Sequence, residues 1–329
     1  MQRSMRSMKT RRRFIQSLAA TATFPLPVIA ADGSNKKLRI GLIADIHKDL
    51  VPDADERLKA FIDAMNLEKV DAVIQLGDFC QPKPKNQGFL EIFHGFPGPK
   101  YHVLGNHDMD GGFKREETVA YYGMENRYYS FDMGGCHFVV LDANDKPEGW
   151  KSGYPHFIAK DQVDWLAADL AATKLNTFIF SHQSLERPAC IDNQEEVRRV
   201  IEAARTPDGK AKVAGCFNGH WHIDHCRRIN GIPYVHINSA SYFWMGGQYR
   251  HDRLDPELAK QFPALASTGP YVKPLFTVLE IDPALGSFTI RAMKSEWQKP
   301  SPQDLNYQSS DIEADFIRAE IRGVDSKAI

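Results

Sequence analysis

The stretch LRIGLIADIH, residues 38–47, joins a strand-like apolar run to two side chains that are able to bind a metal ion. Most of the run is apolar without the alternation of a half-exposed strand, which is typical of a strand covered on both faces. Asp45 and His47 follow the run two residues apart, so in an extended backbone they point to the same side. The stretch therefore predicts a buried strand with two potential ligands at its carboxyl end.

Runs of the same kind recur along the chain, and helical patterns lie between the early ones. The segments 54–67, 160–172 and 193–205 carry apolar residues at helical spacing. Because strands alternate with helices, the sequence predicts an α/β fold. The other strand-like runs are DAVIQL (71–76), YHVL (101–104), HFVVL (137–141), NTFIF (176–180), KVAGCF (212–217), PYVHI (233–237), LFTVLEI (275–281) and SFTIRAM (287–293).

Charge excludes one class of partner. The chain has 329 residues and a formal net charge of −1, but residues 1–31 contain six cations and no acid. Without them the net charge falls to −7. A protein this acidic lacks the clustered Lys and Arg that hold DNA or RNA, so we expect no nucleic-acid polymer as partner.

The amino-terminal segment reads as a targeting signal rather than as part of the fold. TRRRFIQ (10–16) resembles the twin-arginine export signal, and Ala30 and Ala31 suit a cleavage site. The apolar run after it is too short and too polar to span a membrane. The resemblance implies a bacterial protein that the twin-arginine machinery exports to the periplasm. An ordinary secretory signal and a cytoplasmic basic tail are the alternatives.

The remainder divides at a change of composition. Residues 32–297 hold the strand and helix patterns and form the predicted catalytic domain. From 298 the chain becomes rich in Pro and Ser and then shows apolar residues at helical spacing, Ile312, Phe316, Ile317 and Ile321. We therefore expect 298–329 to be a carboxyl-terminal tail with a short amphipathic helix.

Five strand-like runs end in residues that bind metals or move protons. In open α/β sheets, sites form beyond the carboxyl ends of strands, where loops converge. The donors are carboxylate, amide and imidazole, which suit Mn, Fe or Zn. The five strand-end blocks are Asp45-Ile46-His47, Gly77-Asp78, Gly105-Asn106-His107-Asp108, Ser181-His182 and Asn218-Gly219-His220-Trp221-His222.

Spacing alone leaves two interpretations of the last block, Asn218-Gly219-His220-Trp221-His222. His220 and His222 repeat the i, i+2 spacing of the first block, so they are predicted to share one ion. Cys216 and Cys226 flank the same histidines and suggest a structural zinc site instead, although this spacing fits no usual zinc module. Gly77, Gly105 and Gly219 each precede a potential ligand, where a glycine permits a tight turn and close backbone approach.

Taken in order, the blocks D-x-H, G-D, G-N-H-D, H and G-H-x-H resemble the calcineurin-like metallophosphoesterases. The resemblance implies a four-layer α/β/β/α sandwich of two mixed sheets. It also implies two divalent or trivalent ions, one held by Asp45, His47 and His222, the other by Asn106, His182 and His220. Asp78 would bridge them. His107 would act on the leaving oxygen, and Asp108 would orient His107.

The expected activity is hydrolysis of a small phosphomonoester or phosphodiester by a hydroxide that bridges the metals. The alternative is a metal-containing module that binds phosphate or nucleotides without significant turnover. Two positions depart from the family pattern, since Asp108 replaces a frequent Glu and Gln81 stands where Asp or His is common. The sequence leaves the substrate, the metals and the oligomeric state undetermined.

Overall fold

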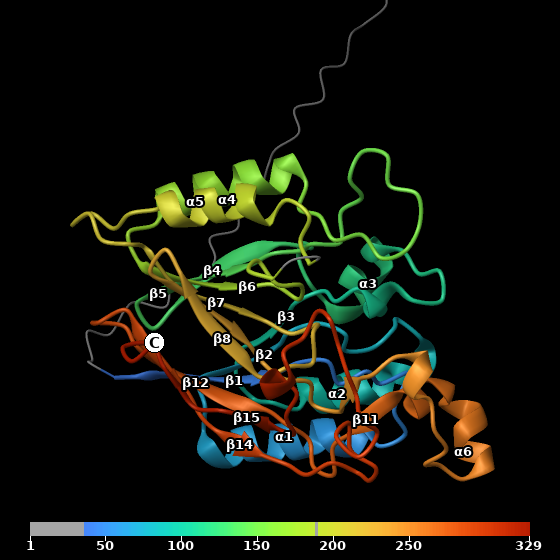
Figure 1. Ribbon diagram of the computed structural model, residues 1–329. Helices are drawn as coiled ribbons and strands as arrows, with labels where there is room; N and C mark the ends of the chain where they lie inside the picture. Colours follow the sequence, from blue (N-terminus) through green and yellow to red (C-terminus); the bar gives the residue numbers. More distant parts are fainter. Residues whose placement is uncertain (1–35, 188–189) are drawn as a thin grey trace, which may run out of the picture. The chain divides into compact units, whose positions relative to one another are not determined.

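The computed structural model describes residues 36–187 and 190–329 (Figure 1). The predicted signal peptide, 1–31, lies outside the described residues, and so export stays a prediction. Within the described part of the chain, no helix combines the length and hydrophobicity needed to cross a bilayer.

The first sheet has six strands in the order β16-β13-β12-β1-β2-β3 and contains the run that begins at Leu38. Its parallel half consists of β1, β2 and β3, while β12, β13 and β16 continue it antiparallel. The strands are β1 (Leu38–Ile43), β2 (Ala72–Gln75), β3 (Lys100–His102), β12 (Thr277–Asp282), β13 (Ser287–Ile290) and β16 (Val324–Asp325).

The second sheet also has six strands, in the order β4-β5-β6-β7-β9-β8. Four central strands are parallel, and antiparallel strands close both edges. The strands are β4 (Tyr129–Met133), β5 (Cys136–Val140), β6 (Asn176–Phe180), β7 (Val213–Asn218), β8 (His225–Ile229) and β9 (Ile232–His236). Both sheets are therefore mixed, as predicted.

Three apolar layers hold the architecture together. Between the sheets, side chains such as Ile40 and Leu279 of the first pack with Phe138 and Phe180 of the second. Helices α1 (Ala54–Glu68) and α2 (Gln87–His94) cover the outer face of the first sheet. Helices α4 (Lys160–Ala172) and α5 (Gln194–Ala203) cover the second (Figure 1). This order of layers confirms the α/β/β/α sandwich.

Smaller elements fill the connections between these layers. The helices are α3 (Arg115–Tyr122) and α6 (Pro256–Gln261), and the short strands are β10 (Tyr242–Trp244), β11 (Thr268–Pro270), β14 (Met293–Lys294) and β15 (Glu320–Ile321). Single 3₁₀ turns lie at η1 (Pro84–Asn86), η2 (His107–Met109), η3 (Gly247–Tyr249), η4 (Pro263–Ser267) and η5 (Ala314–Phe316).

The amphipathic helix predicted in 298–329 is wrong. The described tail contains only the turn η5 and the strands β15 and β16, which pair with β14 and β13. In β15 and β16, backbone N–H and C=O groups form hydrogen bonds with neighbouring strands instead of within a helix. Ile317 and Ile321 are nevertheless buried. Ile312 and Phe316 are only half-buried, so apolar residues at helical spacing indicated the buried positions in part and did not indicate the conformation.

His137 on β5 ties the second sheet to α4. Its Nδ1 lies 2.6 Å from Asp132 Oδ1, and its Nε2 lies 2.8 Å from Asp169 Oδ2. Burial alone would lower the pKa of His137, but the hydrogen bonds to Asp169 and Asp132 outweigh it and raise the pKa above its usual value.

We predict that this histidine makes stability depend on pH. Because its folded pKa is raised, its stabilisation is fully present below the unfolded pKa of about 6.5 and is lost as pH rises through the folded pKa. The substitution His137→Gln should therefore lower the free energy of unfolding more at pH 5.5 than at pH 9. Urea titrations at both pH values measure this, and an equal loss at both would contradict it.

Candidate metal centre

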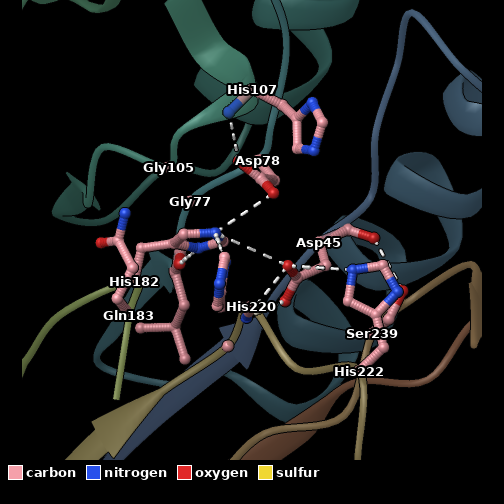
Figure 2. A network of polar contacts seen from close by, with 12 residues as sticks. Asp45, Gly77, Asp78, Gly105, His107, His182, Gln183, His220, His222 and Ser239 are labelled. Carbon is pink, nitrogen blue, oxygen red and sulfur yellow. Dashed lines mark hydrogen bonds and ion pairs between the residues drawn. The ribbon is translucent and has the colours of Figure 1, made fainter. Parts of the chain in front are cut away.

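The first group of potential ligands consists of Asp45, His47 and His222, and Figure 2 shows Asp45 and His222 side by side. Asp45 and His47 follow β1, and His222 follows β7, so both sheets contribute. His222 Nε2 lies 3.1 Å from His47 Nε2 and 3.2 Å from Asp45 Oδ1. All three residues are buried, and their donor atoms lie within 4.8 Å of one another.

The second group consists of Asp78, His182 and His220, which follow β2, β6 and β7. His182 Nε2 lies 3.1 Å from Asp78 Oδ2 and 3.2 Å from His220 Nδ1. The i, i+2 interpretation of His220 and His222 is therefore wrong, because they join different groups. The assignment implied by the family resemblance agrees with the geometry here.

Asp78 lies between the two groups. Its Oδ2 is 3.1 Å from His182 of the second group and 3.7 Å from His47 of the first. Its Oδ1 accepts a hydrogen bond of 2.8 Å from the backbone N–H of His107 (Figure 2). A carboxylate in this position is able to serve both groups at once.

The donor atoms fit a pair of metal ions. Ligands about 2.0–2.2 Å from one ion lie about 3.0–3.5 Å from each other, and the contacts of His222 in the first group and of His182 in the second, 3.1 and 3.2 Å in each case, match this spacing. His182 Nδ1 donates to Leu76 O (2.8 Å) and His222 Nδ1 donates to Tyr242 O (2.7 Å). In the neutral ring that a metal requires, each Nε2 therefore has a lone pair that faces another donor atom, an arrangement that a cation stabilises.

The side-chain oxygen of Asn106 independently indicates that a ligand binds here. The residue is 3% exposed, and among the described residues its Oδ1 is buried with no hydrogen-bond partner. A buried carbonyl oxygen without a partner costs about 1–3 kcal/mol, so such atoms usually have a ligand. In the sequence Asn106 is flanked by Gly105 and His107, both of which lie against Asp78.

Backbone strain concentrates at the same residues. Of the eight non-glycine residues with positive φ in the described chain, five are potential ligands: Asp45, His47, Asp78, His220 and His222. Side chains with a Cβ rarely adopt this conformation, and it persists where the surroundings impose it. Extra contacts hold these turns, such as the 2.8 Å bond from Ser239 Oγ to Asp45 O. The fold thus stores strain to aim these donors.

Three glycines allow the strand ends to meet. A Cβ on Gly77 would lie 2.4 Å from His182 Nδ1, one on Gly105 would lie 2.1 Å from Asp78 N, and one on Gly219 would lie 2.3 Å from Asp45 Oδ2. Each distance is far below van der Waals contact, so a larger residue would displace a candidate ligand.

Burial and charge set the protonation states of the groups. Burial lowers the pKa of His47 and His220 well below the usual value, which keeps both rings neutral, as metal binding requires. Burial alone would raise the pKa of Asp78, but His182 and His107 hold it well below its usual range. Burial alone would also lower the pKa of His182, but Asp78 and Asp45 raise it to about 9, so a cation that binds there has to displace a proton from this ring.

The expectation that Asp108 orients His107 is wrong. Asp108 is 1% exposed, and its carboxylate accepts hydrogen bonds from the N–H groups of Phe79 (2.7 Å) and Gly105 (2.8 Å). Burial and the nearby Asp78 raise its pKa to about 7. Asp108 therefore braces the two loops that carry Asp78 and Asn106, and it does not touch the His107 ring.

Asp110 takes the role expected of Asp108. Its Oδ2 lies 2.6 Å from His107 Nδ1, and its Oδ1 accepts a 2.8 Å hydrogen bond from Tyr154 Oη. The sequence analysis missed Asp110, although its position three residues after His107 in the turn η2 puts it within reach. His156, which the sequence pattern does not single out, also lies near the second group, with its ring centroid 5.7 Å from that of His220.

The structural zinc alternative is contradicted by the two cysteines. Cys216 packs into the apolar layer between the second sheet and its helices, whereas Cys226 packs between the sheets. The two thiols therefore lie on opposite faces of the second sheet, and the intervening histidines belong to the two groups described above.

Fold and site together define a metal-dependent phosphoric ester hydrolase. A model of the calcineurin-like phosphoesterase family matches residues 38–224, which include all five strand-end blocks. The chain belongs to this family.

Known relatives agree with this assignment. The chain is 25% identical over 267 residues, covering 59% of this chain and 80% of the relative, to a rice protein named manganese-dependent ADP-ribose/CDP-alcohol diphosphatase. A dimetal phosphatase from Danio rerio shares the fold with a TM-score of 0.54 and 15% identity, covering 77% of this chain and 95% of that one. GAP50, an anchor in the inner membrane complex of Plasmodium, also shares the fold, with a TM-score of 0.50 and 14% identity. The match covers 80% of this chain and 86% of that one.

We predict that Gly105→Ala abolishes high-affinity metal binding. The added methyl group would push Asp78 out of place and should cost about 1–3 kcal/mol of stability as well. The matched control is Gly88→Ala on α2, where an added Cβ meets nothing within 4 Å and should stabilise the helix slightly. Metal content per chain and urea unfolding measure both effects, and full metal content in Gly105→Ala would contradict the packing argument.

Proposed function

We propose that the chain is an exported, binuclear-metal phosphoesterase that hydrolyses a small phosphomonoester or phosphodiester. One observation carries the proposal: two groups of mostly buried donors from four strand ends lie side by side, and the Asp78 carboxylate of the second group also approaches His47 of the first. This donor set of oxygen and nitrogen suits Mn, Fe or Zn.

In this proposal Asp45, His47 and His222 hold one ion, and Asn106, His182 and His220 hold the other, with Asp78 serving both. When bound, two such ions lower the pKa of water and neutralise charge on the phosphoryl oxygens. Asn106 contributes an oxygen without a negative charge, which leaves the centre more attractive to a phosphate anion.

His107 is the proposed proton donor to the leaving oxygen. Its ring lies at the edge of the centre, with its centroid 5.3 Å from that of His47, and its side chain is about one-third exposed. Because Asp110 accepts from the Nδ1 side, the ring is held in one orientation and Nε2 remains available for substrate. Asp110 is thus a positioning residue for His107.

The rice relative suggests where a substrate search should start. Its name gives manganese as metal and ADP-ribose and CDP-alcohols as substrates. We therefore place diphosphate diesters of nucleosides, assayed with Mn²⁺, beside simpler esters in the first panel. The Plasmodium neighbour is named as an anchor, so the fold alone does not establish turnover, and the donor set must support that part of the proposal.

The function is tested with purified protein of measured metal content. We expect hydrolysis of p-nitrophenyl phosphate, its bis-ester, ADP-ribose or CDP-choline that is lost on chelation and restored by Mn²⁺. Asp78→Asn should lower kcat/KM by at least about 100-fold because one ion loses its shared ligand. His107→Ala should retain two metals but lose turnover. Tight binding of these compounds without any product would instead support the alternative, a metal-containing module that binds phosphate or nucleotides without significant turnover.

Export rests on residues 10–16 and is tested separately. Replacement of Arg11 and Arg12 by Lys should leave the protein in the cytoplasm of a bacterial host with a twin-arginine system, while the wild type appears in the periplasm. Unchanged periplasmic yield would contradict the twin-arginine route without affecting the proposed chemistry.

A further inference from the structure

The loop after β5 is fixed at both ends beside the metal centre. Asp145 N donates to Phe157 O (3.0 Å) and Phe157 N donates to Ala143 O (2.8 Å), which closes residues 146–156 into a loop. Asp192 N holds the far side through a 2.7 Å bond to His156 O. The loop follows the carboxyl end of a central strand, where binding residues of α/β folds are usually found.

Two side chains of this loop approach different parts of the centre. The ring centroid of Tyr154 is 4.8 Å from that of His107, which is itself next to His47 of the first group. The ring centroid of His156 is 5.7 Å from that of His220 in the second group. The segment Tyr154-Pro155-His156 therefore runs alongside both groups.

The local sequence explains this placement. Pro155 fixes its own φ and biases Tyr154 toward extended backbone. In an extended segment, residues two apart point to the same side and lie about 6.6 Å apart along the chain. Tyr154 and His156 are therefore both directed at the centre, at a separation that suits an organic group at one end and the phosphoryl group at the other.

Tyr154 combines a fixed hydroxyl with a large exposed fraction. Its hydroxyl donates to Asp110 Oδ1 (2.8 Å) and lies 3.1 Å from His107 Nδ1, so the ring has one orientation. Yet 42% of the residue is exposed, which makes it one of six large hydrophobic residues exposed in the described chain. The hydrogen bonds fix the hydroxyl, and a large part of the residue remains open to solvent beside the proposed proton donor.

We infer that Tyr154 determines specificity by stacking on a planar group next to the scissile phosphorus-oxygen bond. The inference rests on the proposed function, because it places the leaving group at His107. An aromatic or nucleobase-bearing ester is then preferred over an aliphatic one, since stacking on a preoriented aromatic ring adds to the binding of the phosphoryl group.

The test uses two ligands that the enzyme does not hydrolyse, phenylphosphonate and methylphosphonate, whose carbon–phosphorus bonds resist hydrolysis. Calorimetry measures their affinity for the metal-loaded full chain. We expect phenylphosphonate to bind more tightly in the wild type and in Tyr154→Phe. In Tyr154→Leu and Tyr154→Gln this advantage should fall by about three- to tenfold, with methylphosphonate affinity and metal content unchanged.

Tyr128→Leu is the matched control. Tyr128 precedes β4 and lies against Trp165, with 4.8 Å between ring centroids, so the ratio of affinities should not change. An unchanged ratio in Tyr154→Leu, with methylphosphonate still bound, would overturn the stacking role and leave the proposed function intact. Failure of both phosphonates to bind the metal-loaded wild type would instead count against the proposed function.

Discussion

The structure depends on bringing two buried carboxylates, Asp45 and Asp78, to one place where the strands of two sheets end. Buried charges without partners are costly, and their repulsion would separate the loops. Imidazoles from both sheets surround them at distances of 3.1–3.9 Å, and these contacts leave room for shared cations. The balance of charge at this point therefore ties together segments that are up to about 175 residues apart in the sequence.

The surroundings of the centre keep its ligands from relaxing. Five of them have left-handed backbone, the neighbouring glycines leave no space for a Cβ, and His182 and His222 donate hydrogen bonds to backbone carbonyls, so the ligands have little freedom to move. Such preorganisation is what a site that binds charged phosphate needs, because little reorganisation remains to be done when substrate arrives. The hydrophobic layers on either side of each sheet contribute the free energy of folding that offsets this backbone strain.

Sequence reasoning located the strand ends well because unalternated apolar runs and the glycines that follow them are local signals. It placed Asp45, His47, Asp78, His182, His220 and His222 close together, as the structure does. It failed where conformation depended on tertiary contacts. His220 and His222 belong to different groups although they have the same spacing as Asp45 and His47, which share one, so spacing alone does not assign a ligand to its group. Asp110 replaced Asp108 as the partner of His107 because the turn η2 directs one carboxylate inward and the other outward. The tail satisfied its backbone through strands rather than a helix.

A crystal structure of the protein grown with Mn²⁺ and measured at the manganese absorption edge tests the central claim most directly. The account predicts two anomalous peaks about 3.5–4 Å apart. One should lie about 2.0–2.2 Å from His47 Nε2 and His222 Nε2, the other at the same distance from His182 Nε2 and Asn106 Oδ1, with Asp78 touching both. A single peak, or peaks away from these donors, would contradict it.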